Sequence, residues 1–285
     1  MIQMKKLGIL ILAFSAQIFL AQASRFVYQV TMKPDAANPS DIKTENAYLD
    51  VNKEKSIFYS ENRMKRDSIF GRARQTGSFN FDRSQMQSLC FNIDFTIEKD
   101  FKTGTKTFTS RIARDQYSYN EDRPMEWKIL PETTKIGDYK TQKAETNFGG
   151  RTWYAWFTTD VPFQDGPYKF SGLPGLIVKV EDSKGDYSFD LKETKKIAEL
   201  QNLDSFGSVI KVKRKDYEKQ NAAFRNDPVS FFQAQISSGR GSSGISAPMS
   251  RSGGGMRQPD PNQRKQMEER IKEEIKKTNN PIEIQ

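Results

Sequence analysis

The sequence predicts a mainly β protein, built on one antiparallel, curved meander sheet or open half-barrel. About ten short runs of alternating or β-branched residues follow one another at roughly even spacing, which is typical of such a meander. Glycine-containing turn signals separate several of these runs, and only two helices are plausible after the amino-terminal segment. One packed C-terminal helix, an N-terminal signal helix and a disordered C-terminal tail complete the expected fold.

Alternation of apolar and polar residues marks the strands of the first half of the chain. The runs are residues 26–32, 47–51, 56–59, 91–97, 105–112, 117–119 and 127–129. The cleanest is 91–97, where every second residue is Phe or Ile, so we expect a strand with one buried face. The basic segment 61–77 has no such period and is expected to be irregular.

Turn signals organise the second half. The predicted strands are residues 138–148, 151–159, 175–182, 186–192 and 208–212. Gly149-Gly150 separates the first two, and adjacent glycines suit the positive φ angles of a tight hairpin turn. Residues 213–226 predict a helix that packs on the sheet and ends before Pro228.

Composition divides the chain into four parts. These are a signal peptide at residues 1–23, a β domain at 24–236, a disordered linker at 237–262 and a charged tail at 263–285. The linker is rich in Ser, Gly and Pro and has almost nothing to bury. In the tail, Met267, Ile271 and Ile275 form a narrow stripe, which predicts a marginal solvated helix, with a partner-binding helix as the alternative.

The first residues predict export. Lys5 and Lys6 precede an apolar core at residues 7–20, and residues 21–23 offer small side chains to a signal peptidase. The apolar run of about 14 residues is shorter than the ~20 needed to span a bilayer, which argues against a transmembrane anchor. No cysteine stands directly after this core, which argues against anchoring as a lipoprotein. We therefore expect a periplasmic or secreted protein that is not an integral membrane protein.

Histidine is absent and cysteine occurs once, at Cys90. The lack of histidine excludes Ser-His-Asp, Cys-His and His-ligated metal sites. A single cysteine excludes an internal disulfide, and its apolar neighbours predict a small buried side chain rather than a nucleophile. No nucleophile elbow, phosphate-binding loop or metal-ligand cluster occurs in the sequence, so we expect no catalytic residues, no metal and no cofactor.

The formal net charge is +9, but the signal peptide and residues 237–285 carry more than half of it. The remaining body is nearly balanced, which is unfavourable for nucleic acid binding. One local basic cluster stands out, and it consists of Arg63, Lys65, Arg66, Arg72 and Arg74. We interpret it as a solvated loop. The alternative is docking to an acidic surface, such as lipopolysaccharide headgroups or a partner protein.

Residues 165–180 combine glycines, prolines and aromatic residues directly before a β-branched run. Pro167 and Pro174 restrict their own φ angles, while nearby glycines permit positive ones, so we expect a stiff bend that leads into a buried strand. The residues assigned to this structural motif are Gly166, Pro167, Tyr168, Lys169, Phe170, Gly172, Leu173, Pro174, Gly175, Leu176 and Ile177.

Residues 172–177 read GLPGLI, and the chain resembles the GLPGLI family of exported proteins from Bacteroidetes-type bacteria. Similar blocks stand at residues 126–128, 149–151, 155–158 and 166–170, so the resemblance covers roughly residues 126–190. The family often has a cysteine where Thr141 stands here, so no thiol role is carried over. The resemblance implies export and a biochemical function that is unassigned.

Aromatic residues concentrate around the motif, and Trp153 and Trp156 are expected on opposite faces of one strand. We interpret these rings as core, with an apolar ligand groove or a peptide-docking edge as the alternative. In that alternative the two tryptophans bind a ligand whose polar head is oriented by Arg151, Asp165 and Lys169. We favour pairing of these charged groups with backbone or with one another, which holds the loop.

The favoured function is a non-catalytic binding or accessory protein of the cell envelope. The resemblance implies an outer-membrane or envelope protein as partner, such as the machinery of TonB-dependent transport. The alternative is a periplasmic carrier of a lipid or other hydrophobic ligand, which a solid interior would argue against. A carboxylate-dependent hydrolase, with carboxylates such as Asp160, Asp165, Glu181 or Asp182, is least favoured. We expect a monomer that binds no nucleic acid.

Overall fold

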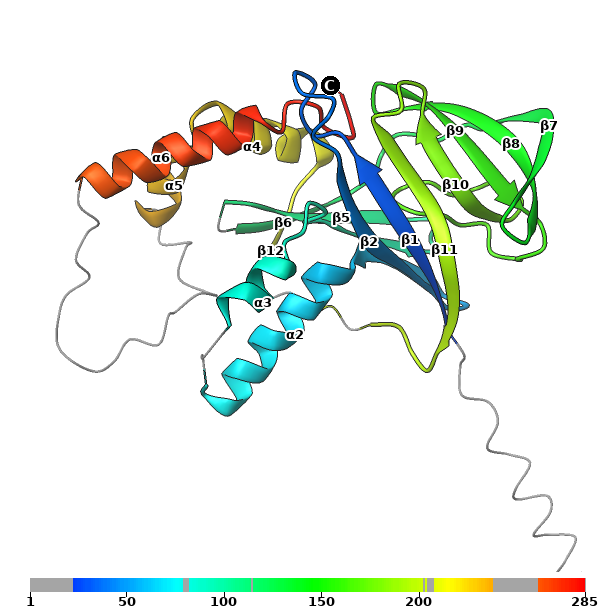
Figure 1. Ribbon diagram of the computed structural model, residues 1–285, viewed down its shortest axis with the longest axis horizontal. Coiled ribbons are helices and arrows are strands. Elements are labelled where there is room, and N and C mark those ends of the chain that lie inside the picture. The colour runs from blue at the N-terminus through cyan, green and yellow to red at the C-terminus, as the bar shows by residue number, and fades with distance from the viewer. Residues whose placement is uncertain are drawn as a thin grey trace, which may run out of the picture.

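The computed structural model describes residues 23–78, 82–113, 115–201, 203, 208–237 and 261–284 (Figure 1). The predicted signal peptide, apart from Ala23, and nearly all of the predicted linker lie outside these residues. No helix in the described part of the chain is long and apolar enough to cross a membrane.

The protein is mainly β, as predicted, and twelve strands form one open sheet (Figure 1). Their order is β12-β6-β5-β4-β3-β2-β1-β11-β10-β9-β8-β7. The strands are β1 (Ala23–Met32), β2 (Lys43–Val51), β3 (Lys55–Ser60), β4 (Thr96–Asp100), β5 (Lys106–Ile112), β6 (Asp115–Asn120), β7 (Lys128–Ile136), β8 (Tyr139–Phe148), β9 (Arg151–Thr158), β10 (Leu176–Asp182), β11 (Tyr187–Ile197) and β12 (Val209–Lys211). β12 runs parallel to β6, so the sheet is mixed rather than purely antiparallel.

Two predicted turns form as expected. Gly149 and Gly150 join β8 to β9 with φ angles of +59° and +74°, the positive values that a two-residue primed turn requires. Between β10 and β11, Asp182 Oδ1 accepts hydrogen bonds from the backbone N–H groups of Asp186 and Tyr187 at 2.7 and 2.9 Å. This carboxylate holds the reversal between the two strands.

The two faces of the sheet are packed differently. The main core lies on one face and takes alternating apolar side chains from most strands. It also includes Tyr168, Phe170 and Leu173 from the segment between β9 and β10. The opposite face carries a small cluster made of Val27, Tyr48, Ile57 and Tyr59.

Residues 61–77, expected to be irregular, form helix α2 (Glu61–Thr76), so that prediction is wrong. Ser60 caps the helix by accepting a backbone N–H of its first turn at 3.2 Å, and Gly77 ends it with a φ of +68°. The helix has almost no apolar stripe, so periodicity could not reveal it. Helix α3 (Arg83–Ser88) follows, and both helices project below the strands in Figure 1.

Strand β4 begins only at Thr96, so the predicted strand at residues 91–97 is wrong over most of its length. The Glu45 carboxylate accepts the backbone N–H groups of Asn92 and Ile93 at 2.5 and 3.2 Å, and these bonds hold the stretch as a loop. Cys90, just before this loop, is exposed rather than buried, so that prediction is wrong as well.

Three helices follow the sheet: α4 (Arg214–Asn226), α5 (Pro228–Ser237) and α6 (Pro261–Lys276). The predicted packed helix is α4, whose Tyr217 ring lies 5.2 Å from that of Tyr119, whereas α5 was not predicted. Helix α6 lies where the sequence predicts a marginal helix in the charged tail, and beyond it the chain returns to the sheet. We call residues 279–284 the C-terminal strap, and they end beside β1 and the β8–β9 turn (Figure 1).

Candidate functional site

The motif loop, residues 159–175, connects β9 to β10 and folds back on itself. Asp165 and Ser171 form an isolated antiparallel bridge, and the Ile177 N–H donates to the Asp165 carbonyl at 2.9 Å. Tyr168 and Phe170 are at most 1% exposed, although connecting loops ordinarily run over the surface. The loop is therefore a compact turn whose side chains belong to the main core.

Aromatic packing surrounds the loop. The Phe170 ring centroid lies 4.8 Å from that of Trp153, and the Tyr168 centroid lies 5.4 Å from that of Phe95. Trp153, a candidate binding residue, is thus a core side chain. Trp156 lies half-buried on the opposite face, beside Lys143. The strand brings the two tryptophans to different environments and not to one groove.

Asp165 pairs with a lysine that sequence reasoning missed. Lys99 Nζ on β4 lies 2.5 Å from Asp165 Oδ1 and also donates to the carbonyls of Gly166 and Phe170 at 2.6 and 3.0 Å. Burial lowers the pKa of Lys99, and the Asp165 charge acts in the opposite direction. One ammonium group therefore ties three points of the motif loop to the sheet.

Lys169 lies at the centre of a second buried network. Its Nζ donates to the Tyr119 hydroxyl at 2.9 Å and to the carboxylates of Glu121 and Glu283 at 2.6 Å each. Arg123 binds Glu121 through two hydrogen bonds and reaches Glu283 Oε2 at 2.7 Å. The two cations thus neutralise the two carboxylates.

The two cations lower the pKa values of both glutamates. Burial opposes ionisation of Glu121, but the Arg123 hydrogen bonds and the Lys169 charge outweigh it and lower its pKa to about 2. Burial likewise opposes ionisation of Glu283, yet Lys169 and Arg123 lower the pKa of Glu283 below its ordinary value. Both groups are therefore carboxylates at neutral pH.

Arg151 forms the third network, at the start of β9. Its Nη1 lies 2.7 Å from Asp182 Oδ2 and 3.1 Å from Asp186 Oδ2. Its Nη2 donates to Asn280 Oδ1 at 2.5 Å and to the Pro281 carbonyl at 2.8 Å. This guanidinium therefore joins the β10–β11 turn to the C-terminal strap.

The predicted basic cluster is divided by helix α2. Arg63 donates to the Asp94 carbonyl at 2.5 Å, and Arg66 lies over the Phe91 ring at 5.4 Å, so both serve local packing. The exposed members are Lys65, Arg72 and Arg74. The cluster thus lies on a helix rather than a solvated loop, with Lys65 and Arg72 exposed on one side of α2 and Arg74 exposed on the other.

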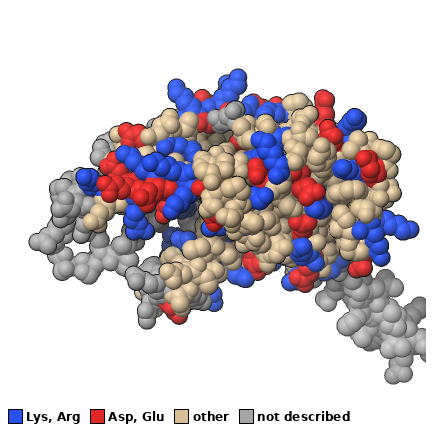
Figure 2. Space-filling view, turned by 45° about the horizontal axis from the view of Figure 1, so that its top comes forward, with Lys and Arg blue, Asp and Glu red and all other residues tan. Residues whose placement is uncertain are grey.

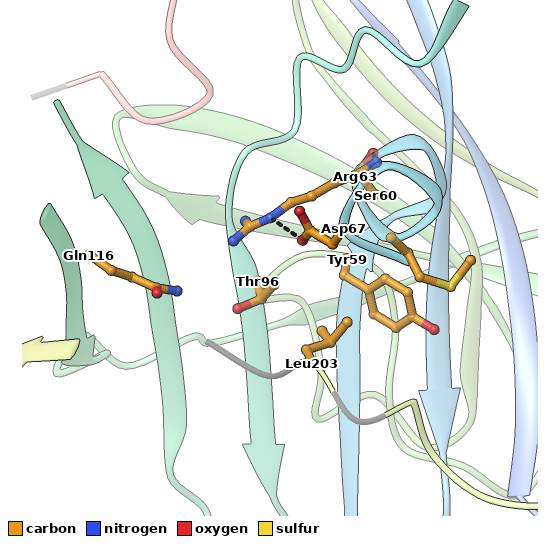
Figure 3. A pocket seen from close by; sticks show the side chains of 8 residues that line it. Tyr59, Ser60, Arg63, Asp67, Thr96, Gln116 and Leu203 are labelled. Carbon is orange, nitrogen blue, oxygen red and sulfur yellow. Dashed lines mark hydrogen bonds and ion pairs between the residues drawn. The ribbon is translucent and has the colours of Figure 1, made fainter. Parts of the chain in front are cut away.

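A small cavity lies between α2 and the sheet (Figure 3). It encloses about 30 Å³, room for no more than a few water molecules. Its lining includes Tyr59, Arg63, Asp67, Gln116 and Leu203. None of its lining residues belongs to the motif loop, so the cavity and the buried ion networks are separate features.

Acid is expected to weaken the ion pairs that hold the C-terminal strap against the rest of the protein. The pKa values of Glu121 and Glu283 lie below the ordinary 4.5, so their stabilisation is complete above about pH 4.5 and is lost as the pH falls toward 2. Near pH 6, Glu283→Gln should lower the free energy of unfolding by about 1–3 kcal/mol. Urea denaturation should show this difference shrinking between about pH 5 and 2.5. An equal difference across that range would contradict the assignment.

Comparison with known proteins places one match on this site. A family model described as "Protein of unknown function (Porph_ging)" matches residues 148–179. The match runs from the β8–β9 turn through β9 and the motif loop into β10, and it contains Arg151, Asp165 and Lys169. No curated protein matches the chain.

Three solved structures are similar to parts of the chain. PNGF-II in two crystal forms matches with TM-scores of 0.49 and 0.46 at 18% identity, over 70% of this chain and 33% and 32% of that chain. This chain thus spans about a third of the length of PNGF-II. An outer membrane lipoprotein-sorting protein domain from Vibrio parahaemolyticus matches with a TM-score of 0.23 at 9% identity, over 69% of this chain and 94% of that one. All three TM-scores lie below 0.5, so we transfer no property from these proteins.

Proposed function

We propose that this chain is a non-catalytic binding or accessory protein of the cell envelope. The supporting observation concerns the charged groups of the motif region, Arg151, Asp165 and Lys169. They are at most 5% exposed, and each is held in an ion pair inside the protein. A catalytic acid, base or nucleophile has to reach its substrate, whereas these groups hold the motif loop and the C-terminal strap.

Envelope placement rests on the amino terminus, where residues 5–23 have the pattern of a signal peptide. The resemblance of residues 126–190 to exported proteins agrees with this. Within the envelope we propose a protein partner, such as an outer-membrane transport component.

The docking surface that we propose is helix α2, through its exposed cations Lys65, Arg72 and Arg74. Figure 2 shows acidic and basic side chains interspersed over one face of the molecule. An exposed helix that carries three outward cations is suited to a partner with an acidic surface, although Lys65 also pairs with Glu61 at 2.6 Å. The carrier alternative has less support, because Tyr168, Phe170 and Leu173 fill the space over the main core.

Photo-crosslinking in intact envelopes tests this proposal. The variant Lys65→Gln, Arg72→Gln, Arg74→Gln should reduce the yield of the crosslinked complex by about tenfold, because the charges that steer association are removed. The matched control is Lys128→Gln, Lys135→Gln, Lys140→Gln, which removes three exposed charges from the β7–β8 edge. Equal yields from both variants would contradict the docking surface. Recovery of one lipid per protein on extraction would favour the carrier.

A further inference from the structure

The C-terminal strap lies across three segments that are distant in sequence. The Asn280 N–H donates to the Pro34 carbonyl at 2.9 Å, and the Ile284 N–H donates to the Gly149 carbonyl at 2.7 Å. Strap residues between these anchors contact the motif loop. The strap is therefore bound at both ends through its backbone, much as a short peptide is bound in a groove.

The contacts around the Asn280 side chain, which we call the amide pocket, are complementary to an amide group. Asn280, 8% exposed, donates its Nδ2 to the Lys33 carbonyl at 2.8 Å and accepts from Arg151 Nη2 through Oδ1. The Tyr187 hydroxyl donates to the Asn280 carbonyl at 2.6 Å. Since this pocket offers both an acceptor and a donor, an amide satisfies it and a carboxylate does not.

The contacts around the Glu283 side chain, which we call the carboxylate pocket, are complementary to a carboxylate. Glu283 accepts from Lys169 and Arg123, as described above, and also from the Tyr168 hydroxyl. Arg123 is also held by two hydrogen bonds to Glu121, a residue outside the strap, which orients its guanidinium group toward Glu283. Two cations and a hydroxyl converge on one acidic side chain.

The strap residues Glu283 and Ile284 lie against the β8–β9 turn. A Cβ added to Gly149 would lie 2.8 Å from the Glu283 Cγ, and one added to Gly150 would lie 2.3 Å from the Ile284 carbonyl oxygen. The two glycines therefore provide the hairpin turn and also the space in which the strap backbone lies. A side chain at either position would clash with the strap where it now lies.

The strap and α6 follow α5 after 23 residues that lie outside the described part of the chain. Residues 238–260 connect α5 to α6, and a chain of that length can reach at most about 80 Å. The covalent link alone therefore does not fix where the strap lies. The hydrogen bonds given by Arg225 to the carbonyls of Ile275 and Thr278 hold the end of α6, and the pockets hold the strap itself.

We propose that the β8–β9 turn, Arg151, Arg123 and Lys169 form a binding site for an extended peptide that carries an Asn followed three residues later by a Glu. The C-terminal strap is the occupant of this site in the structure. The same segment therefore binds when it is presented on a separate molecule. This site is distinct from the α2 surface proposed above, and it does not depend on it.

The test uses the full chain with a protease site placed within residues 238–260. After cleavage, the fragment that contains α6 and the strap should stay bound in native mass spectrometry. A fluorescent peptide of residues 261–285 should displace it, with binding followed by anisotropy. The uncleaved chain should bind the peptide at least about a hundredfold more weakly, because its own strap competes at an effective concentration near millimolar.

Two substituted peptides and one control make the test specific. Glu283→Gln and Asn280→Asp should each weaken binding by about tenfold or more, the cost of removing a charge-assisted or a complementary hydrogen bond. Glu269→Gln, an exposed site on α6, removes the same charge and should leave binding unchanged. The proposal is overturned if the cleaved chain unfolds, if the fragment does not exchange, or if Glu283→Gln binds as well as the unsubstituted peptide.

Discussion

Replacing Lys99 with Met is expected to lower the free energy of unfolding by about 3–5 kcal/mol. The ammonium group is the partner of Asp165 and of two carbonyl groups in the motif loop. Without it, the Asp165 carboxylate stays buried without a counter-charge, and Asp165 Oδ2 already has no hydrogen-bond partner among the described residues. Urea or thermal denaturation of the purified variants measures the loss.

The matched control is Lys106→Met on the neighbouring strand. Lys106 is paired with Lys99 across the two strands, and burial together with the Lys99 charge lowers its pKa to about 8. It has no ion pair in the part of the chain that the structure describes, so the same substitution there should cost less than about 1 kcal/mol.

A double-mutant cycle separates the ion pair from simple loss of packing. Adding Asp165→Asn to Lys99→Met should recover part of the loss, because the buried charge is then removed while the amide oxygen can still accept the Gly166 N–H, as Asp165 Oδ1 does. We expect a coupling energy of about 1–3 kcal/mol. Additive effects, or a Lys99→Met variant as stable as Lys106→Met, would show that the pair does not hold the loop.

Sequence patterns predicted the strands well because alternation and turn chemistry act locally. The same alternation also contained a signal for the missed site residues. The run that buries Ile97 places Lys99 on the same face, and the run that buries Tyr119 leads directly to Glu121. A charged residue at the next inward position of an apolar run therefore marks a candidate buried ion.

Other parts of the site could not be predicted from local patterns. Nothing in the sequence near Asp165 points to Lys99 as its partner, since the two meet only through the sheet order. The strap has no periodicity of its own, because it binds through backbone groups and two polar side chains. Helix α2 was missed for a related reason: its caps define it, and it has little apolar surface to bury.

The expected effect of Gly175→Ala is a loss of more than about 4 kcal/mol, enough to prevent folding of many domains of this size. Gly175 has a φ of +150°, and an added Cβ would lie 1.9 Å from the Thr158 carbonyl oxygen and 3.1 Å from the Thr159 Cα. Both obstacles are backbone at the end of β9, and they cannot swing aside as a side chain could. The substitution therefore has to move the motif loop away from the strand it follows.

Gly172→Ala is the matched control within the same hexapeptide. Gly172 also has a positive φ, +94°, but an added Cβ would meet nothing within 4 Å. The cost should then be limited to backbone strain, about 1–3 kcal/mol. The yield of soluble protein and the urea midpoint of both variants give the comparison. Similar losses for the two glycines would mean that positive φ alone explains the motif, whereas a much larger loss at Gly175 identifies close packing of the loop on β9 as the requirement.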